Sequence, residues 1–184
     1  IAIKSGRNNG GRRVAMPTEN VVVRNCQFRK GHGGLGIGSE ISGGVQNVFM
    51  EDCTLDSPEL DRVLRFKNNA RRGGQVRNVF LRNLRVKQVR QAVLAIQFTY
   101  EEGARGPYQP LLYNARMEGI FCENTPSMLL LESFPGARIQ DVVVADSTFL
   151  GLRHPDVVQH GSVRYENLVL QPADSARAKL PWEK

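Results

Sequence analysis

The amino-acid sequence predicts an all-β chain wound as a right-handed parallel β-helix, a solenoid, or as part of one. Three observations support this fold class. Short strand-like segments recur along the 184 residues, and most end in Asn or Asp. Apolar residues alternate within them at a period of two, as in strands with one buried face. The sequence shows little helical periodicity, and its 18 Gly and 9 Pro interrupt the segments between the strands. A β-sandwich is the alternative, but it does not explain a repeated signature.

The repeat consists of five segments closed by Asn or Asp, at residues 21–25, 48–52, 79–83, 120–124 and 142–146, with a weaker sixth copy at 168–170. The closing positions 25, 52, 83, 124 and 146 are 27, 31, 41 and 22 residues apart, which fits one coil per step. We expect each closing side chain at a bend, where it can bond backbone groups and tolerate a positive φ. We expect the alternating apolar residues to stack as buried ladders.

Residues 1–184 are predicted to form a single β-helix domain. The longest step contains a polar segment at residues 100–110, which predicts a loop leaving one side of the solenoid, where insertions often shape a binding surface. Residues 171–184 depart from the repeat and are predicted to cap the last coil. The chain opens on Ile1 without an initiator Met or a leader-like segment, so we expect it to be the C-terminal part of a longer protein.

The net charge of +7 is concentrated in the first half of the chain. Residues 1–90 hold 17 Lys and Arg against 7 Asp and Glu, a balance of +10, whereas residues 91–184 hold 8 against 11, a balance of −3. A basic half favours an anionic partner, either a nucleic acid or an acidic polysaccharide. Aromatic residues, 7% of the chain, are not interleaved with the basic ones, which argues against a platform for stacking single-stranded bases. No apolar run is long enough for a membrane span.

The cysteines and two late histidines predict no metal site. Cys26, Cys53 and Cys122 lie far apart, and without a CxxC pair or clustered histidines we expect buried free thiols. His154 and His160 are expected to be solvated. We therefore expect neither a metal nor a cofactor.

Residues 31–40 (GHGGLGIGSE) contain five glycines, which predicts tight turns or the close approach of a ligand; a flexible surface loop is the alternative. If successive coils stack, one groove is lined by Lys4, His32, Arg65 and Lys67. The spacing of Arg65 and Lys67 puts both on one strand face, with Phe66 turned into the core. Two adjacent cations suit an anionic ligand, and a solvated basic strand face is the alternative.

Four motifs follow one another along the chain: IAIKSGR at residues 1–7, GHG at 31–33 with IGSE at 37–40, RFK at 65–67 and RRGG at 71–74. Together they resemble glycoside hydrolase family 28, the polygalacturonases. The segments GHGG…IGSE and ARRGG are most similar to bacterial exo-acting members. The similarity runs in order to about residue 150. Phe66 stands where the family usually has Ile or Leu, a tolerable core substitution.

The resemblance implies a pectin-degrading hydrolase, secreted or periplasmic, that acts on polygalacturonate and cleaves α-1,4-linked galacturonic acid with inversion. In such enzymes one aspartate is the general acid and two hold the water, with acid and base about 6.5–9.5 Å apart. The family pattern gives His32 the role of orienting or tuning the acid. It assigns Arg65 and Lys67 to the galacturonate carboxylate and Lys4 to the edge of the same subsite. Tyr100 matches a family tyrosine that contacts sugar.

Weaker expectations concern other charged residues. Glu40 is expected either to contact sugar hydroxyls or to pair with a nearby arginine. Arg71 and Arg72 are expected to add positive potential at the groove or to pair with Asp61 and Glu59.

The family's aspartates lie in an Asn-Thr-Asp motif and in an Asp-Asp-Cys directly before the Ile-Ala-Ile-Lys segment. No Asp precedes Asp52 here, so we expect the chain as given to be an inactive fragment that carries the binding half of the site. One alternative is a pectate lyase, whose Ca²⁺ is held by clustered carboxylates that this sequence lacks. A second is a non-catalytic β-helix that binds acidic polysaccharide. A third, nucleic-acid binding, rests on charge alone and predicts steep salt dependence. The oligomeric state is left open.

Overall fold

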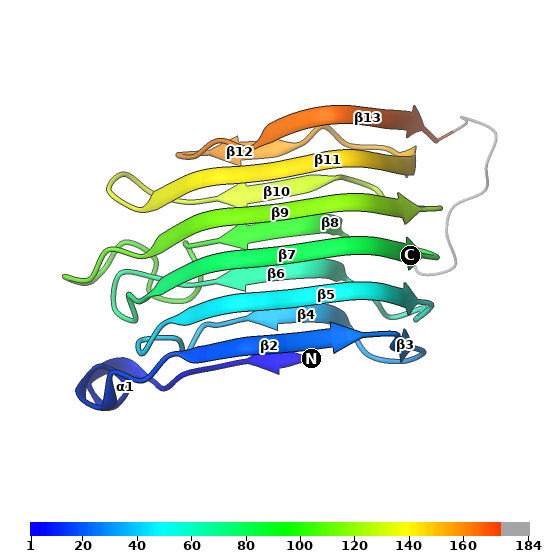
Figure 1. The fold of residues 1–184 in the computed structure, drawn as a ribbon. Helices are drawn as coiled ribbons and strands as arrows, with labels where there is room; N and C mark the ends of the chain where they lie inside the picture. The colour runs from blue at the N-terminus through cyan, green and yellow to red at the C-terminus, as the bar shows by residue number, and fades with distance from the viewer. Residues whose placement is uncertain (174–184) are drawn as a thin grey trace.

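The computed structural model describes residues 1–173 and shows a parallel β-helix (Figure 1). Successive coils stack along one axis, and each coil adds one strand to each of two sheets. Parallel strands joined by such crossover connections are right-handed in nearly all proteins. The fold is therefore the predicted solenoid, with its two sheets facing one another across a continuous core.

The first sheet, here called the narrow sheet, has six strands in the order β1-β4-β6-β8-β10-β12. Their bounds are β1 (Ala2–Ile3), β4 (Gly33–Ile37), β6 (Arg62–Lys67), β8 (Ala92–Gln97), β10 (Leu129–Glu132) and β12 (Val157–Gln159). All of its pairs are parallel. Residues far apart in the sequence therefore lie in columns across this sheet.

The second, broad sheet has seven strands, in the order β13-β11-β9-β7-β5-β2 with β3 paired to β5. Their bounds are β2 (Thr18–Arg24), β3 (Gln27–Phe28), β5 (Val45–Leu55), β7 (Gln75–Val86), β9 (Leu111–Cys122), β11 (Arg138–Leu152) and β13 (Arg164–Pro172). One short helix, α1 (Asn8–Val14), lies beside the first coil. The predicted polar loop is present between β8 and β9.

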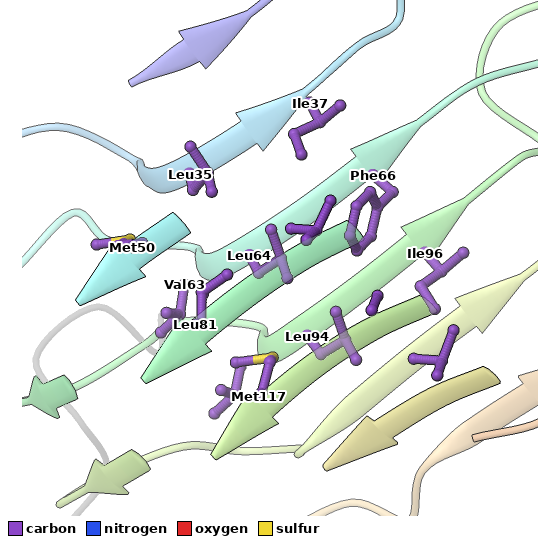
Figure 2. Close-up of a cluster of buried hydrophobic side chains, with 14 of the residues drawn as sticks. Leu35, Ile37, Met50, Val63, Leu64, Phe66, Leu81, Leu94, Ile96 and Met117 are labelled. Carbon is purple, nitrogen blue, oxygen red and sulfur yellow. The ribbon is translucent and has the colours of Figure 1, made fainter. Parts of the chain in front are cut away.

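The core lies between the sheets and consists of in-register ladders. Ile37, Phe66, Ile96 and Leu131 occupy one column of the narrow sheet. Figure 2 shows the first three of these side chains with Met50, Leu81 and Met117, which come from the broad sheet. Each of the seven is at most 2% exposed. The period-two alternation thus places one apolar side chain per coil at the same depth.

The closing Asn and Asp residues lie at bends with left-handed backbone geometry. Asn25, Asp52, Asn83 and Asp146 have φ of 54°, 53°, 53° and 46°. The fourth predicted copy, at residues 120–124, is wrong by five residues. Leu84 pairs with Ile120, so the residue opposite Asn83 is Gly119, with φ of 62°. Glycine adopts a positive φ at low cost because it has no side chain. This bend therefore needs no Asn or Asp, and the sequence shows no such residue at it.

The sixth predicted copy, at residues 168–170, is also five residues away from the true one. Ala145 pairs with Glu166 and Ser147 with Leu168, so Asn167 lies opposite Asp146. Asn167 has φ of 47°, and its side chain donates a 2.8 Å hydrogen bond to Asp146. The bend therefore precedes residues 168–170.

A second column of bends lies five residues before the first. Asn20, Asn47, Asn78, Asn114 and Asp141 have φ between 53° and 58°. The amides of Asn47, Asn78 and Asn114 each donate to the preceding asparagine Oδ1, at 3.0, 2.9 and 2.9 Å. We call residues 20, 47, 78 and 114 the asparagine ladder. It bonds four coils to one another through side chains as well as through backbone.

The three thiols are free; Cys53 and Cys122 are buried and Cys26 is partly exposed. In the part of the chain that the structure describes, no helix is long and apolar enough to cross a membrane. Of the predicted capping tail, residues 171 and 172 continue β13, and residues 174–184 lie outside the described residues.

Candidate functional site

A cleft of 350 Å³ lies over the narrow sheet at its N-terminal coils. Six basic side chains line it: Lys4, Lys30, His32, Arg62, Arg65 and Lys67. No Asp or Glu is among its lining residues in the part of the chain that the structure describes. We call it the basic cleft. It brings together the four residues that the sequence places in one groove, and it adds Lys30 and Arg62.

The glycine-rich stretch forms the floor of this cleft. Residues 33–37 are strand β4, hydrogen-bonded between β1 and β6, so this segment is a strand within a sheet and not a flexible loop. Gly36 lies between Ala2 and Arg65 in one column, where its missing side chain leaves space above the sheet. Gly38 has φ of 105°, and a Cβ there would lie 2.0 Å from the carbonyl oxygen of Lys67. Gly38 is thus required by close approach, whereas Gly36 serves to keep the floor of the cleft open.

Arg65 and Lys67 project from β6 on either side of Phe66, which is 1% exposed. The Arg65 Nε donates a 2.7 Å hydrogen bond to Gln97 Oε1, and Gln97 in turn donates to Glu132 at 2.6 Å. Burial lowers the pKa of Arg65, and the pKa of Lys67 is lowered by burial and by the charges of Arg65 and Lys4. Neither cation forms an ion pair with a carboxylate among residues 1–173. Half-buried cations without a carboxylate partner are stabilised by a bound anion, so an anion is the ligand that suits this pair.

Arg62 was missed by sequence reasoning. It opens β6 opposite Gly33, is 9% exposed, and donates to Gln91 Oε1. Burial and the neighbouring Arg65 lower its pKa, and its Nε has no hydrogen-bond partner among the described residues. Its position three residues before Arg65 does not follow strand alternation, because Val63 and Leu64 are both buried. A periodicity argument therefore does not find it.

Tyr100 covers two of the cleft cations. Its ring centroid lies 5.3 Å from Lys67 Nζ and 5.6 Å from Arg65 Cζ, which are cation–π distances. The residue comes from the loop between β8 and β9, one coil beyond β6. Its contact with sugar stays a prediction.

Glu40 forms an ion pair with Lys4, with 2.7 Å between Nζ and Oε2. The hydrogen bond from Lys4 lowers the pKa of the Glu40 carboxyl. The pairing partner is thus a lysine and not an arginine. Because the pair balances one cation, Lys4 is more fully neutralised than Arg65 or Lys67.

His32 lies at the rim of the cleft between two glycines, and its side chain is exposed. Its carbonyl oxygen accepts a 2.9 Å hydrogen bond from the backbone N–H of Asp61, which fixes the turn to the next coil. His154 and His160 are also exposed. Residues 1–173 contain no group of three or more His, Cys, Asp or Glu arranged to hold a metal ion.

The predicted partners of Arg71 and Arg72 are wrong. Arg72 pairs with Glu101 at 2.6 Å, and Arg71 lies 3.5 Å from Glu102. Both carboxylates belong to the loop between β8 and β9, which folds back over residues 68–74. Asp61 instead lies 3.8 Å from Arg90.

Comparison with known proteins gives consistent matches. The family model "Glycosyl hydrolases family 28" matches residues 1–124. A protein described as "Probable polygalacturonase" from Vitis vinifera is 26% identical over 153 residues, which is 80% of this chain and 30% of that protein. A polygalacturonase from Ralstonia solanacearum is 34% identical over 94 residues, 47% of this chain and 18% of that one.

Among solved structures, a hyperthermoactive exopolygalacturonase from Thermotoga maritima matches with a TM-score of 0.88 and 29% identity. The match covers 93% of this chain and 38% of that one, and it confirms the predicted right-handed β-helix. The chain thus spans less than a third of the length of these two curated relatives.

Proposed function

Because the chain belongs to glycosyl hydrolase family 28, we propose that it supplies the substrate-binding part of a pectin-degrading glycosidase whose substrate is polygalacturonate. The basic cleft is the observation that carries this proposal. Its six basic side chains suit a polymer with one carboxylate per sugar, and no carboxylate of residues 1–173 lines it.

Arg65 and Lys67 bind the carboxylate of one galacturonate unit in this proposal. The guanidinium offers a planar pair of donors, and the ammonium acts as a point charge two residues along the same strand. Arg62 extends the same cationic surface toward the start of β6, with its Nε unpaired among the described residues. Lys4 with Glu40 and Tyr100 mark the edges of the subsite, where hydroxyls and a sugar face are contacted.

The hydrolytic step follows the inverting route, in which a general acid protonates the leaving oxygen and a second group activates water. By the family pattern these carboxylates precede Ile1, and this chain covers 38% of the exopolygalacturonase that it resembles. We propose that they come from residues outside this sequence, that His32 orients the acid at the cleft rim, and that the enzyme is exo-acting and exported. The 184-residue chain by itself binds but does not hydrolyse.

The natural gene product that contains these residues provides the test. Reducing ends released from polygalacturonate are measured for the wild type, for His32→Ala, and for the double variant Arg65→Ala/Lys67→Ala. We expect both variants to lose most of the activity, with the double variant raising KM. Arg13→Ala/Arg85→Ala is the matched control, because it removes two exposed cations outside the cleft and is expected to leave activity unchanged.

Other results of this assay would contradict the proposal and point to a different function. Unsaturated products would mean a lyase, and binding without any product would mean a non-catalytic polysaccharide-binding β-helix. Mixed oligomers as early products, in place of monomer, would contradict exo action.

A further inference from the structure

Asn69 is a completely buried amide that joins two loops, and it makes four hydrogen bonds. Its Nδ2 donates to the carbonyl oxygen of Tyr100 at 2.9 Å and to Glu102 Oε2 at 2.8 Å. Its Oδ1 accepts from the backbone N–H groups of Arg71 and Arg72, at 3.0 and 2.8 Å. One side chain thus holds residues 68–74, here called the clamp loop, against residues 98–106, here called the tyrosine loop.

Arg72 joins the same two loops through an ion pair. Its side chain is 2% exposed, and its guanidinium donates to Glu101 Oε2 at 2.6 Å and to Asn8 Oδ1 at 3.3 Å. A buried arginine is costly unless its charge is paired. The ion pair therefore fixes Glu101, the residue after Tyr100, to the clamp loop.

Backbone contacts extend the attachment. Ala70 N–H donates to the carbonyl oxygen of Gly103 at 2.8 Å. A Cβ at Gly106 would lie 2.3 Å from the carbonyl oxygen of Ala70, so the two loops touch without room for a side chain. The tyrosine loop is consequently placed by the clamp loop as well as by its own strands.

We propose that Asn69 and Arg72 are positioning residues for the carboxylate site: they hold the tyrosine loop so that Tyr100 covers Arg65 and Lys67. The clamp loop begins directly after Lys67, at the end of β6, so one segment carries the cations and fixes their cover. This inference rests on the proposed function of the basic cleft. Neither Asn69 nor Arg72 lines the cleft. Both act through Tyr100, whose ring lies over Arg65 and Lys67.

The binding test uses calorimetry of trigalacturonate with the natural gene product that contains these residues, and every protein compared carries His32→Ala to slow cleavage of the ligand. Arg72→Lys keeps the charge but loses the forked donors, and Asn69→Asp keeps the shape but loses the donor to Tyr100. We expect each to raise the Kd about tenfold, the cost of one charge-assisted hydrogen bond. Arg71→Gln is the matched control, because its side chain is 61% exposed and its pair with Glu102 is long; it should change the Kd less than about twofold. Glu101→Gln removes the exposed partner of the pair if a buried variant fails to fold.

A double-variant cycle separates positioning from general damage. In a Tyr100→Ala background, Arg72→Lys and Asn69→Asp should cause no further loss of affinity, because the group they position is gone. Full additivity of the losses, or unchanged affinity in the single variants, would overturn the inference.

A readout that needs no ligand is the titration of Lys67, followed by NMR of its side chain. Burial is the main cause of the lowered pKa of Lys67; the charges of Arg65, Lys4 and Arg62 lower it further, and Glu101 raises it. Loosening the tyrosine loop admits water, so the pKa should rise in Arg72→Lys and in Asn69→Asp and stay unchanged in Arg71→Gln. If the protein that carries His32→Ala alone does not bind trigalacturonate, the proposed function fails, and this titration alone decides whether the two residues position the loop.

Discussion

Single residues in the basic cleft differ in how far their charge is already balanced. Lys4 has Glu40 at 2.7 Å, whereas Lys67 faces Arg65 and Tyr100 with no carboxylate bonded to it among the described residues. A cation held near other cations gains most from an incoming carboxylate. Lys67 is therefore the residue at which protonation should control binding.

Lys67 should set an alkaline limit on binding. Burial and neighbouring cations lower its pKa, so it loses its proton at a lower pH than an ordinary lysine, whose pKa is about 10.4. Affinity for trigalacturonate should fall as pH rises through that lowered pKa. Calorimetry between about pH 7 and about pH 10 measures the fall, and Lys67→Arg should move it to higher pH because guanidinium stays charged. Identical profiles for the two proteins would contradict the assignment.

Gly38→Ala should destabilise the chain by about 2 kcal/mol or more, because φ of 105° and a Cβ 2.0 Å from the Lys67 carbonyl oxygen both oppose a side chain. Denaturant unfolding gives the free energy. Gly33→Ala is the control: no heavy atom lies within 4 Å of its added Cβ, and its change should stay within about 1 kcal/mol. Equal effects at the two sites would refute the close-approach argument.

Among the elements, the bends of the broad sheet depend on residues that tolerate positive φ. The asparagine ladder combines that backbone geometry with a hydrogen bond from one coil to the next. Each bend thus has a local and a cross-coil contribution to stability.

Asn78 tests the two contributions separately. Asn78→Ala should lower the free energy of unfolding by about 1–3 kcal/mol, since it loses bonds to Asn47 and Asn114 and strains φ of 57°. Asn78→Gly should cost less, because glycine relieves the strain but not the lost bonds. Chemical unfolding of both variants measures this. Equal losses would show that backbone strain contributes nothing here.

Across the whole molecule, positive charge is concentrated at one end of the solenoid. The excess of Lys and Arg in residues 1–90 lies in the coils that carry β1, β4 and β6, where the basic cleft is. Under the proposed function, long-range attraction of a polyanion to this region would add to the contacts within the cleft.

Affinity for trigalacturonate should therefore weaken several-fold when NaCl is raised from about 0.05 to about 0.5 M, as the screening length shortens. The slope should be shallower for Arg65→Ala/Lys67→Ala, which removes two of the attracting charges. Calorimetry at each salt concentration measures both. Single-stranded DNA that binds more tightly than trigalacturonate at every salt concentration would favour the nucleic-acid alternative.

The sequence by itself determined the solenoid and most of the basic cleft. Strand alternation is local, and stacked coils convert a repeated pattern into columns, so Lys4, Arg65 and Lys67 could be placed together without coordinates. The same reasoning was wrong at the fourth bend. This bend is made by Gly119 and has no Asn, and the prediction used Asn124, five residues later, in its place.

Only the tertiary structure decided which loops meet. Arg72 pairs with Glu101 and Asn69 bonds Tyr100 because the loop between β8 and β9 folds back onto the preceding coil. Arg62 enters the cleft through a break in strand alternation. Strand ladders repeat with a period that can be read along the chain, whereas loop contacts depend on packing between irregular segments, for which neighbouring residues carry no periodic signal.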